Sequence, residues 1–212
     1  MDNTEKSERI RICPPAPRGD ISPFLTAQAA DIHVRLICGR LAAELNILLD
    51  GYPAFHGLDA SAVHARTGML PRLLREDVRF AAGGVICHTF FFSHLGTNGG
   101  RGVPDAACAA ALRGAFGSTD SFFYIFREEA QRMQSGGFLW LCAVRGGRGR
   151  GLRLLPTRSY DLPPATLTPI FALDLWEHAY LTAYGSDRRA YADAFLRQLD
   201  WESVGRAISE VQ

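Results

Sequence analysis

The heptapeptide DLWEHAY, residues 174 to 180, places Asp174 and His178 four positions apart in an aromatic setting. Both side chains are good metal ligands, but an isolated pattern of this kind is not evidence of a site. Asp174 lies near the end of the apolar run PIFALDL, residues 169 to 175. A buried carboxylate costs several kcal/mol unless a cation or hydrogen-bond donors compensate it. The rest of the chain must therefore supply that compensation.

Two histidines elsewhere in the chain are candidates to meet Asp174. His33 lies in the first long helical pattern and His88 in the second, each among apolar residues. Taken alone, each is more often a core histidine than a ligand. A metal ion held by His33, His88, Asp174 and His178 would account for all four residues together. Three imidazoles and one carboxylate suit iron or manganese, with a position left for water or a small oxygen species.

Length and composition indicate an ordinary globular protein. The chain has 212 residues, of which 47% are hydrophobic and 21% charged, enough for one large domain or two small ones sharing a core. The formal net charge of +1, without a basic block, argues against a nucleic-acid partner. The N-terminal residues contain no apolar signal segment, and no later stretch has eighteen apolar residues, so we expect a cytoplasmic protein without a membrane segment. Five scattered cysteines without a C-x-x-C pair favour reduced thiols.

The pattern of apolar and turn-forming residues predicts an α+β fold. We expect an extended N-terminal arm over 1–20, a long helical hairpin over 21–96 that starts at Ser22, and a C-terminal α/β domain over 97–212. Gly83 and Gly84 interrupt the second helix of the hairpin and ask for a packing or functional reason. The C-terminal domain is expected to carry a small three-stranded antiparallel sheet, with strands near 138–144, 151–157 and 170–175 and a glycine-rich hairpin tip at 145–151. Its helices are expected near 105–115, 119–134, 177–184, 188–198 and 201–209.

Several segments resemble the iron/manganese superoxide dismutases. DLWEHAY is similar to the C-terminal metal signature of that family, and HTFFF at 88–92 to its second ligand motif. The segment at 21–46 is similar to the family's first helix and places His33 at the first ligand position. The resemblance covers most of residues 21–209 and includes two further segments, FGSTDSF at 116–122 and SGGFLWLCAV at 135–144.

The resemblance implies one iron or manganese ion per subunit, bound between the hairpin and the C-terminal domain by His33, His88, Asp174 and His178. It also implies an antioxidant oxidoreductase that acts on superoxide, and a homodimer. In that dimer Glu177 of one subunit would orient His178 of the other. Trp176 and Tyr180 match the family as well, and we expect Tyr160, Glu177 and Tyr180 to act in catalysis.

The chain departs from the family around the predicted metal. Four and eight residues after His33 the family has a histidine and a gateway tyrosine of a proton path, and this chain has Ile37 and Leu41. Because a helix presents positions i, i+4 and i+8 on one side, we expect both to face the route to the metal. Gly84 stands where iron-type members have a glutamine that tunes the redox potential of the metal. Manganese-type members bring that glutamine from the sheet, and the corresponding residue here is Tyr160, whose hydroxyl could donate a hydrogen bond to the bound solvent.

These departures leave three hypotheses. The first is superoxide dismutation at a mononuclear site of three histidines and one aspartate. The second is an oxidase or oxygenase of the same fold, acting on a small organic substrate in a cavity opened by Gly84 and Leu41. The third, a non-catalytic interaction protein, is the weakest because all four ligands are present. Since the residue that separates iron-type from manganese-type members is absent from both of its places, the sequence does not select the metal, nor does it distinguish a dimer from a tetramer.

Overall fold

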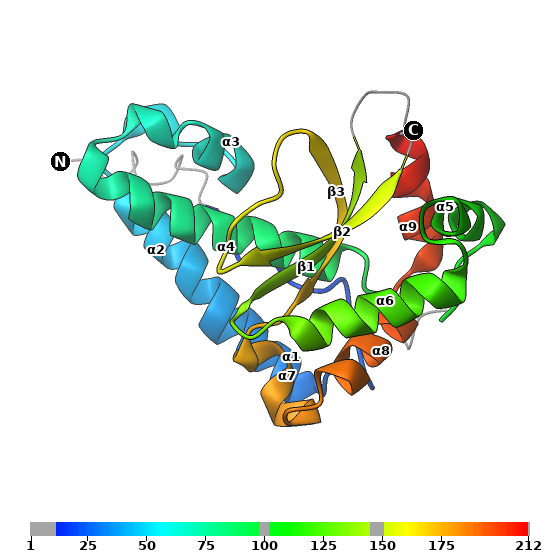
Figure 1. Cartoon of the computed structure of the whole chain (residues 1–212). Coiled ribbons are helices and arrows are strands. Elements are labelled where there is room, and N and C mark those ends of the chain that lie inside the picture. Colours follow the sequence, from blue (N-terminus) through cyan, green and yellow to red (C-terminus); the bar gives the residue numbers. More distant parts are fainter. Residues whose placement is uncertain (1–11, 98–101, 145–150, 212) are drawn as a thin grey trace.

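A computed structural model of the chain describes residues 12–97, 102–144 and 151–211. Helices surround a three-stranded antiparallel sheet, which confirms the predicted α+β fold (Figure 1). Part of the predicted N-terminal arm and most of the predicted hairpin tip lie outside the described residues.

The first long helix of the hairpin changes its winding where it passes the predicted metal site. It runs through α1 (Ala27–Ile32), a π-helical segment η2 (His33–Cys38) and α2 (Gly39–Leu49). It begins after Thr26, whose hydroxyl accepts a hydrogen bond from the amide of Ala29 at 3.2 Å, so the predicted start at Ser22 is wrong.

The second long helix of the hairpin, α4 (Arg75–Ser93), packs against α2 (Figure 1). Its small residues, including Gly83 and Gly84, are buried and allow close packing with neighbouring segments. The connection between the two long helices consists of short helical turns: η3 (Pro53–Phe55), α3 (Ala60–Ala65), η4 (Thr67–Met69) and η5 (Arg72–Leu74).

The C-terminal domain is built on a sheet whose strand order is β2-β1-β3. Strand β1 (Gly137–Val144) is central and almost entirely buried, β2 (Leu152–Arg158) lies on one side and β3 (Leu167–Asp174) on the other. The register places Phe138 of β1 opposite Asp174, so the candidate ligand lies at the end of β3. The helices of this domain are α5 (Ala106–Phe116), α6 (Thr119–Arg132), α7 (Glu177–Tyr184), α8 (Arg188–Gln198) and α9 (Trp201–Glu210).

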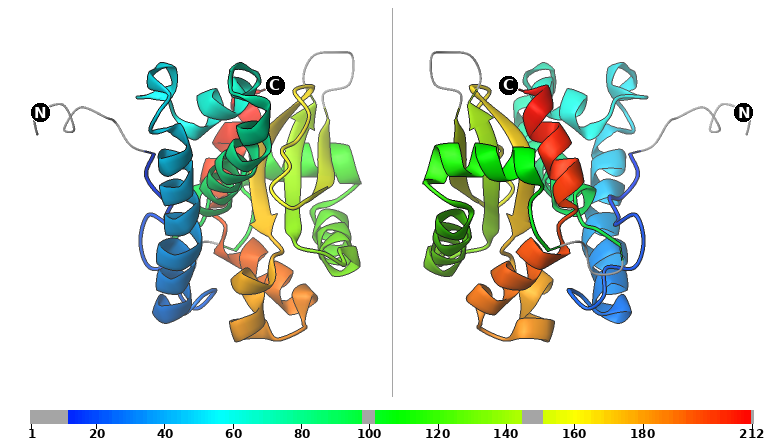
Figure 2. Two further views of the ribbon diagram at one scale, coloured as in Figure 1. Left: turned by 90° about the vertical axis from the view of Figure 1, so that its left-hand side faces the viewer. Right: turned by 90° about the vertical axis from the view of Figure 1, so that its right-hand side faces the viewer.

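The hairpin and the C-terminal domain share one core. The sheet lies between the hairpin on one side and helices α5 and α6 on the other (Figure 2). Phe91 of α4 stacks on Phe195 of α8 with ring centroids 5.9 Å apart, and Phe24 stacks on Tyr191 at 5.4 Å. Because aromatic contacts join the two parts, side chains from both can meet at a site between them.

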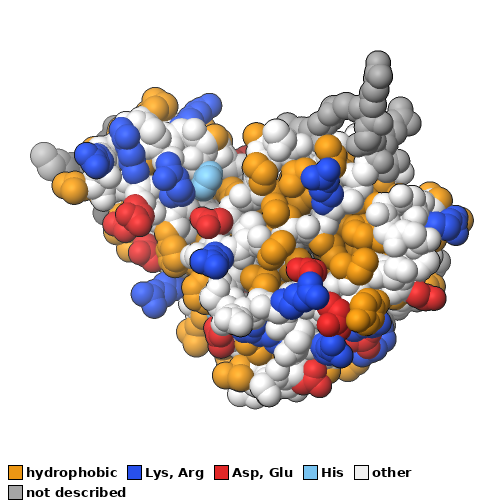
Figure 3. Space-filling view, in the orientation of Figure 1, with side chains coloured by type: hydrophobic (Ala, Val, Ile, Leu, Met, Phe, Trp, Pro, Cys, Tyr) orange, Lys and Arg blue, Asp and Glu red, His pale blue; other side chains and the backbone are white. Residues whose placement is uncertain are grey.

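The surface over α6 and α8 mixes charges of both signs (Figure 3). Arg127 of α6 pairs with Asp193 of α8 at 2.8 Å, and Arg189 pairs with Glu128. No helix in the described ranges combines the length and the apolar character needed to cross a membrane.

Candidate metal centre

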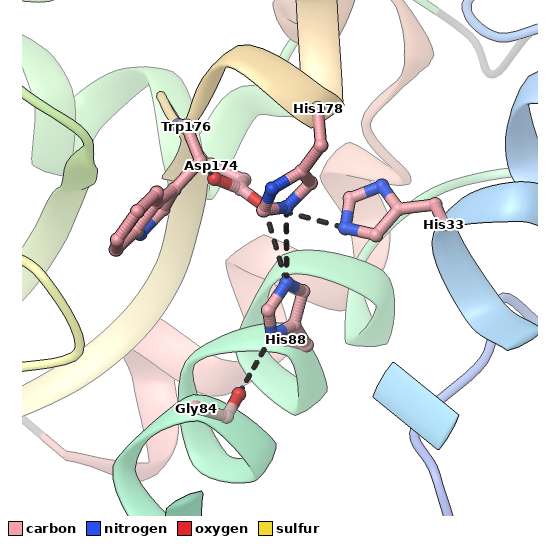
Figure 4. A network of polar contacts seen from close by, with 6 residues as sticks. All are labelled: His33, Gly84, His88, Asp174, Trp176 and His178. Atoms are coloured by element: carbon pink, nitrogen blue, oxygen red, sulfur yellow. Dashed lines mark hydrogen bonds and ion pairs between the residues drawn. The ribbon is translucent and has the colours of Figure 1, made fainter. Parts of the chain in front are cut away.

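Four side chains from separate elements converge between the hairpin and the sheet (Figure 4). His33 is the first residue of η2, His88 lies in α4, Asp174 ends β3 and His178 lies in the first turn of α7. Their ligand atoms all lie within 4.8 Å of one another. His33, His88 and Asp174 are at most 1% exposed, whereas the side chain of His178 is 19% exposed. The structure thus brings together the four ligands that the sequence predicted.

Four of the distances within this cluster are those expected for ligands of a single metal ion. Asp174 Oδ2 lies 3.1 Å from Nε2 of His178 and 3.3 Å from Nε2 of both His33 and His88. The Nε2 atoms of His88 and His178 are 3.5 Å apart. Ligand atoms that each lie about 2.1 Å from one ion are separated by roughly 3 to 3.6 Å. Both ring nitrogens of His33 are buried without a hydrogen-bond partner, and a bound ion would satisfy Nε2.

The chain turns sharply after β3, and this turn brings Asp174 and His178 together. Asp174 Oδ1 accepts a hydrogen bond from the backbone amide of Trp176 at 2.9 Å, while Oδ2 faces the histidines. Trp176 has extended backbone angles and immediately precedes α7, so His178 falls in the first helical turn. The spacing of four residues therefore spans a strand end and a helix start.

His88 is oriented by its own helix. Its Nδ1–H donates a hydrogen bond of 2.7 Å to the carbonyl oxygen of Gly84, one turn earlier in α4. Because a carbonyl can only accept, the proton lies on Nδ1 and the lone pair of Nε2 is directed at the cluster. Such contacts fix the tautomer and the ring orientation of metal ligands.

The protonation states at neutral pH suit metal binding. Burial lowers the pKa of His33 to about 4, although Asp174 opposes the shift, so this imidazole is neutral. Burial alone would raise the pKa of Asp174, but the electrostatic effect of His178, together with the nearby imidazoles of His33 and His88, outweighs burial and holds the pKa well below its usual range. A neutral imidazole and an ionised carboxylate are the forms that bind metals.

The cavity predicted beside Gly84 is filled. A Cβ added at Gly84 would lie 2.8 and 2.9 Å from the two terminal methyl groups of Leu41 and 3.2 Å from Cδ2 of Tyr160. Leu41 is 5% exposed. The expectation that Gly84 and Leu41 open space for an organic substrate is therefore wrong at this position, because Leu41 and Tyr160 occupy that space.

The π-helical winding changes which residues of η2 face inward. In His33–Cys38 the buried residues are His33 and Cys38, five positions apart, while Ile37 is only partly buried. The hydrogen bonding here follows five-residue spacing, since the amide of Gly39 bonds to the carbonyl of Val34. Burial raises the pKa of the Cys38 thiol and Asp174 adds to the shift, so this thiol keeps its proton.

Tyr160 and Trp176 form an aromatic wall of the site. Tyr160 is 8% exposed, and its ring stacks on Trp176 at 5.1 Å and an interplanar angle of 28°. The ring of Tyr160 also lies 5.6 Å from that of His88, and Trp176 stacks on His178 at 6.1 Å. Burial raises the pKa of Tyr160, and Asp174 raises it further, so the phenol keeps its proton at neutral pH.

Glu177 and Tyr180 belong to a network on α7 that reaches Arg188 of α8. Glu177 has a half-exposed side chain, and its Oε1 lies 3.6 Å from Nη2 of Arg188. The Nε–H of Arg188 donates a hydrogen bond of 2.9 Å to the hydroxyl of Tyr180. Arg188 is only 9% exposed although it is the first residue of α8. The sequence offered no signal that Arg188 would be buried against Tyr180.

Comparisons with known proteins find relatives along most of the chain. Residues 104–207 match the family model described as "Iron/manganese superoxide dismutases, C-terminal domain". The chain is 32% identical over 191 residues to the Mn/Fe superoxide dismutase of Methylomonas sp., covering 90% of this chain and 92% of that protein. It is 29% identical over 187 residues to the Mn superoxide dismutase of Listeria monocytogenes, covering 88% of this chain and 90% of the relative. It is also 29% identical over 183 residues to the Mn superoxide dismutase of Thermus thermophilus, covering 86% of this chain and 88% of that protein.

Proposed function

The chain belongs to the iron/manganese superoxide dismutase family, and we propose that it dismutates superoxide at one iron or manganese ion held by His33, His88, Asp174 and His178. The observation that carries the proposal is the convergence of these four side chains, whose ligand atoms lie within 4.8 Å of one another. When bound, the metal would accept and donate single electrons. Asp174 supplies negative charge next to the ion, and the neutral His33 needs no deprotonation before it binds.

We propose that Tyr160 and Tyr180 act around this metal. Tyr160 retains its proton at neutral pH and lies against His88, which supports a role as hydrogen-bond donor to solvent on the metal. Tyr180 is fixed by Arg188, so its hydroxyl has a defined position beside α7. With Leu41 and the partly buried Ile37 at the positions of the family's tyrosine and histidine, these two phenols are the candidates for proton delivery.

We also propose a homodimer in which Glu177 reaches His178 of the partner subunit. Within the described chain, the ring of His178 makes its polar contacts through Nε2, which leaves Nδ1 available to a partner carboxylate. Glu177 is half exposed, and neighbouring α1, η2 and α7 carry the exposed apolar residues Ile32, Leu36 and Leu181. Sedimentation velocity should show a dimer for the natural chain and a monomer for Glu177→Arg, and a natural chain that sediments as a monomer contradicts this part.

The main test loads the protein with iron or manganese and measures superoxide removal. We expect rapid turnover in the natural chain and none in His33→Gln, which removes a ligand. His94→Gln is the matched control because His94 lies outside the cluster and bonds to Ser203. A protein that binds the metal with full occupancy but does not remove superoxide refutes dismutation. That result would favour the oxidase or oxygenase alternative.

Leu41→Tyr offers a second test of the same mechanism. If proton delivery limits turnover in the natural chain, a hydroxyl at this position should raise the rate. The expected gain is about tenfold or more, because positioned proton donors contribute at least about a hundredfold. An unchanged rate in a metal-loaded variant would show that another group delivers the proton.

A further inference from the structure

The turn that carries Tyr160 lies directly on helix α4 at Gly83. A Cβ added at Gly83 would be 2.5 Å from the carbonyl oxygen of Tyr160 and 3.3 Å from its Cβ. Because the clashing oxygen belongs to the backbone, a side-chain rotation cannot relieve the contact. Gly83 stands five residues before His88 on the same helix. This contact is the packing reason for a glycine at position 83 inside the continuous helix α4.

The turn itself is held in an unusual conformation. Ser159 has a φ of +50°, in the left-handed region that residues with a Cβ seldom adopt. The amide of Asp161 bonds to the carbonyl of Arg158 at 3.0 Å and closes the turn, while the amide of Ser159 bonds to the carbonyl of Gly136 at 3.0 Å. The turn is thus tied to the start of β1 on one side and pressed onto α4 on the other.

A second glycine, Gly136, lies against Trp176, the stacking partner of Tyr160. A Cβ added at Gly136 would lie 2.7 Å from the indole atoms Cδ2 and Cε3 of Trp176. Trp176 in turn stacks on Tyr160. Gly83 therefore contacts the backbone of the turn that carries Tyr160, and Gly136 contacts the indole of Trp176. The ring of Tyr160 packs against His88, and that of Trp176 packs against His178.

We propose that Gly83 and Gly136 are positioning residues of the metal centre, which seat the Tyr160–Trp176 pair and thereby fix the ring planes of His88 and His178. This inference rests on the proposed metal site but not on its reaction. A metal bond is directional at the imidazole nitrogen, so a ring that can tilt holds the ion less firmly. Changes in the groups that orient metal ligands typically alter affinity about 10- to 100-fold.

The test compares two helical glycines in the iron-loaded protein. Gly83→Ala displaces the Tyr160 turn, whereas Gly114→Ala in α5 meets no atom within 4 Å and serves as the matched control. For Gly83→Ala we expect iron to dissociate about 10 to 100 times faster and the ferric electron paramagnetic resonance spectrum to change its rhombicity. Gly114→Ala should change neither. Equal dissociation rates and spectra for the natural chain and Gly83→Ala would overturn the inference.

A double-mutant cycle shows whether Gly83 acts through the Tyr160 ring. Tyr160→Ala alone should accelerate iron dissociation, and Gly83→Ala added to it should change the rate by less than about twofold. An undiminished effect of Gly83→Ala in the Tyr160→Ala background would contradict the inference. Should Gly83→Ala fail to fold, Tyr160→Leu tests the Tyr160–Trp176 ring pair without changing helix α4. An iron dissociation rate within about twofold of the natural chain would then overturn the inference.

The outcomes separate this inference from the proposed function. If Gly83→Ala speeds iron dissociation as expected but the natural chain does not remove superoxide, the positioning role is supported and dismutation is refuted. Superoxide turnover, together with an iron dissociation rate that Gly83→Ala does not change, would support dismutation and refute the positioning role.

Discussion

The contact between Leu41 and Gly84 predicts a strong energetic coupling between α2 and α4. An alanine at position 84 would bring its Cβ to 2.8 and 2.9 Å from the Leu41 methyl groups and 3.2 Å from Tyr160. Overpacking of this kind costs about 1 to 3 kcal/mol, and the better helix propensity of alanine returns about 1 kcal/mol. Gly84→Ala alone should therefore lower the free energy of unfolding by about 0 to 2 kcal/mol.

Leu41→Ala by itself should lower the free energy of unfolding by more, about 2 to 5 kcal/mol, because removal of this buried side chain leaves a cavity. In the double variant the new methyl group at position 84 occupies part of that cavity and no longer collides with Leu41. The double variant should accordingly be more stable than the sum of the single effects by about 1 to 3 kcal/mol.

Urea unfolding of the four metal-free proteins measures this coupling directly. Gly114→Ala, with no atom within 4 Å, supplies the helix-propensity gain without overpacking and corrects the Gly84→Ala value. Additivity of the two changes within about 0.5 kcal/mol would show that Leu41 does not occupy the space above Gly84, and would refute the account of the filled cavity.

Three further predictions concern stability. A chelator should lower the melting temperature of the metal-loaded natural chain but not that of His33→Gln, because an ion that binds only the folded state stabilises it; equal shifts in calorimetry would contradict the four-ligand site. Tyr184→Phe removes a hydroxyl that donates to the carbonyl of Phe24 at 2.6 Å, and should lower the free energy of unfolding in urea by about 1 kcal/mol, whereas no loss would show that this bond is not formed in solution. Burial lowers the pKa of His94, so the unfolded chain binds a proton at higher pH than the folded one, and stability should fall as pH drops below about 6.5. Metal-free His94→Gln should show a shallower loss in melting temperature between about pH 7 and pH 5 than the natural chain, and identical slopes would rule out this contribution.

Local patterns were sufficient for most of the elements and for naming the candidate ligands. The strands and helices of the C-terminal domain follow from apolar alternation and helical periodicity, and Ser118 caps α6. His33 was identified through a loose resemblance, and the structure places it with the other three ligands. The start of the first helix was missed because Ser22 and Thr26 are both good capping residues and the choice between them depends on how the preceding segment packs.

The chain by itself determined which donors are available and in which elements they lie, because residue type and periodicity are local properties. Tertiary structure alone decided what surrounds them. The π-helical winding that buries Cys38, the filling of space beside Gly84 by Leu41, and the seating of Tyr160 on Gly83 all depend on atoms brought together from distant positions. Close packing is a property of the assembled interior, where a shift of a few tenths of an ångström separates a cavity from a contact, and no spacing along the chain encodes that distance.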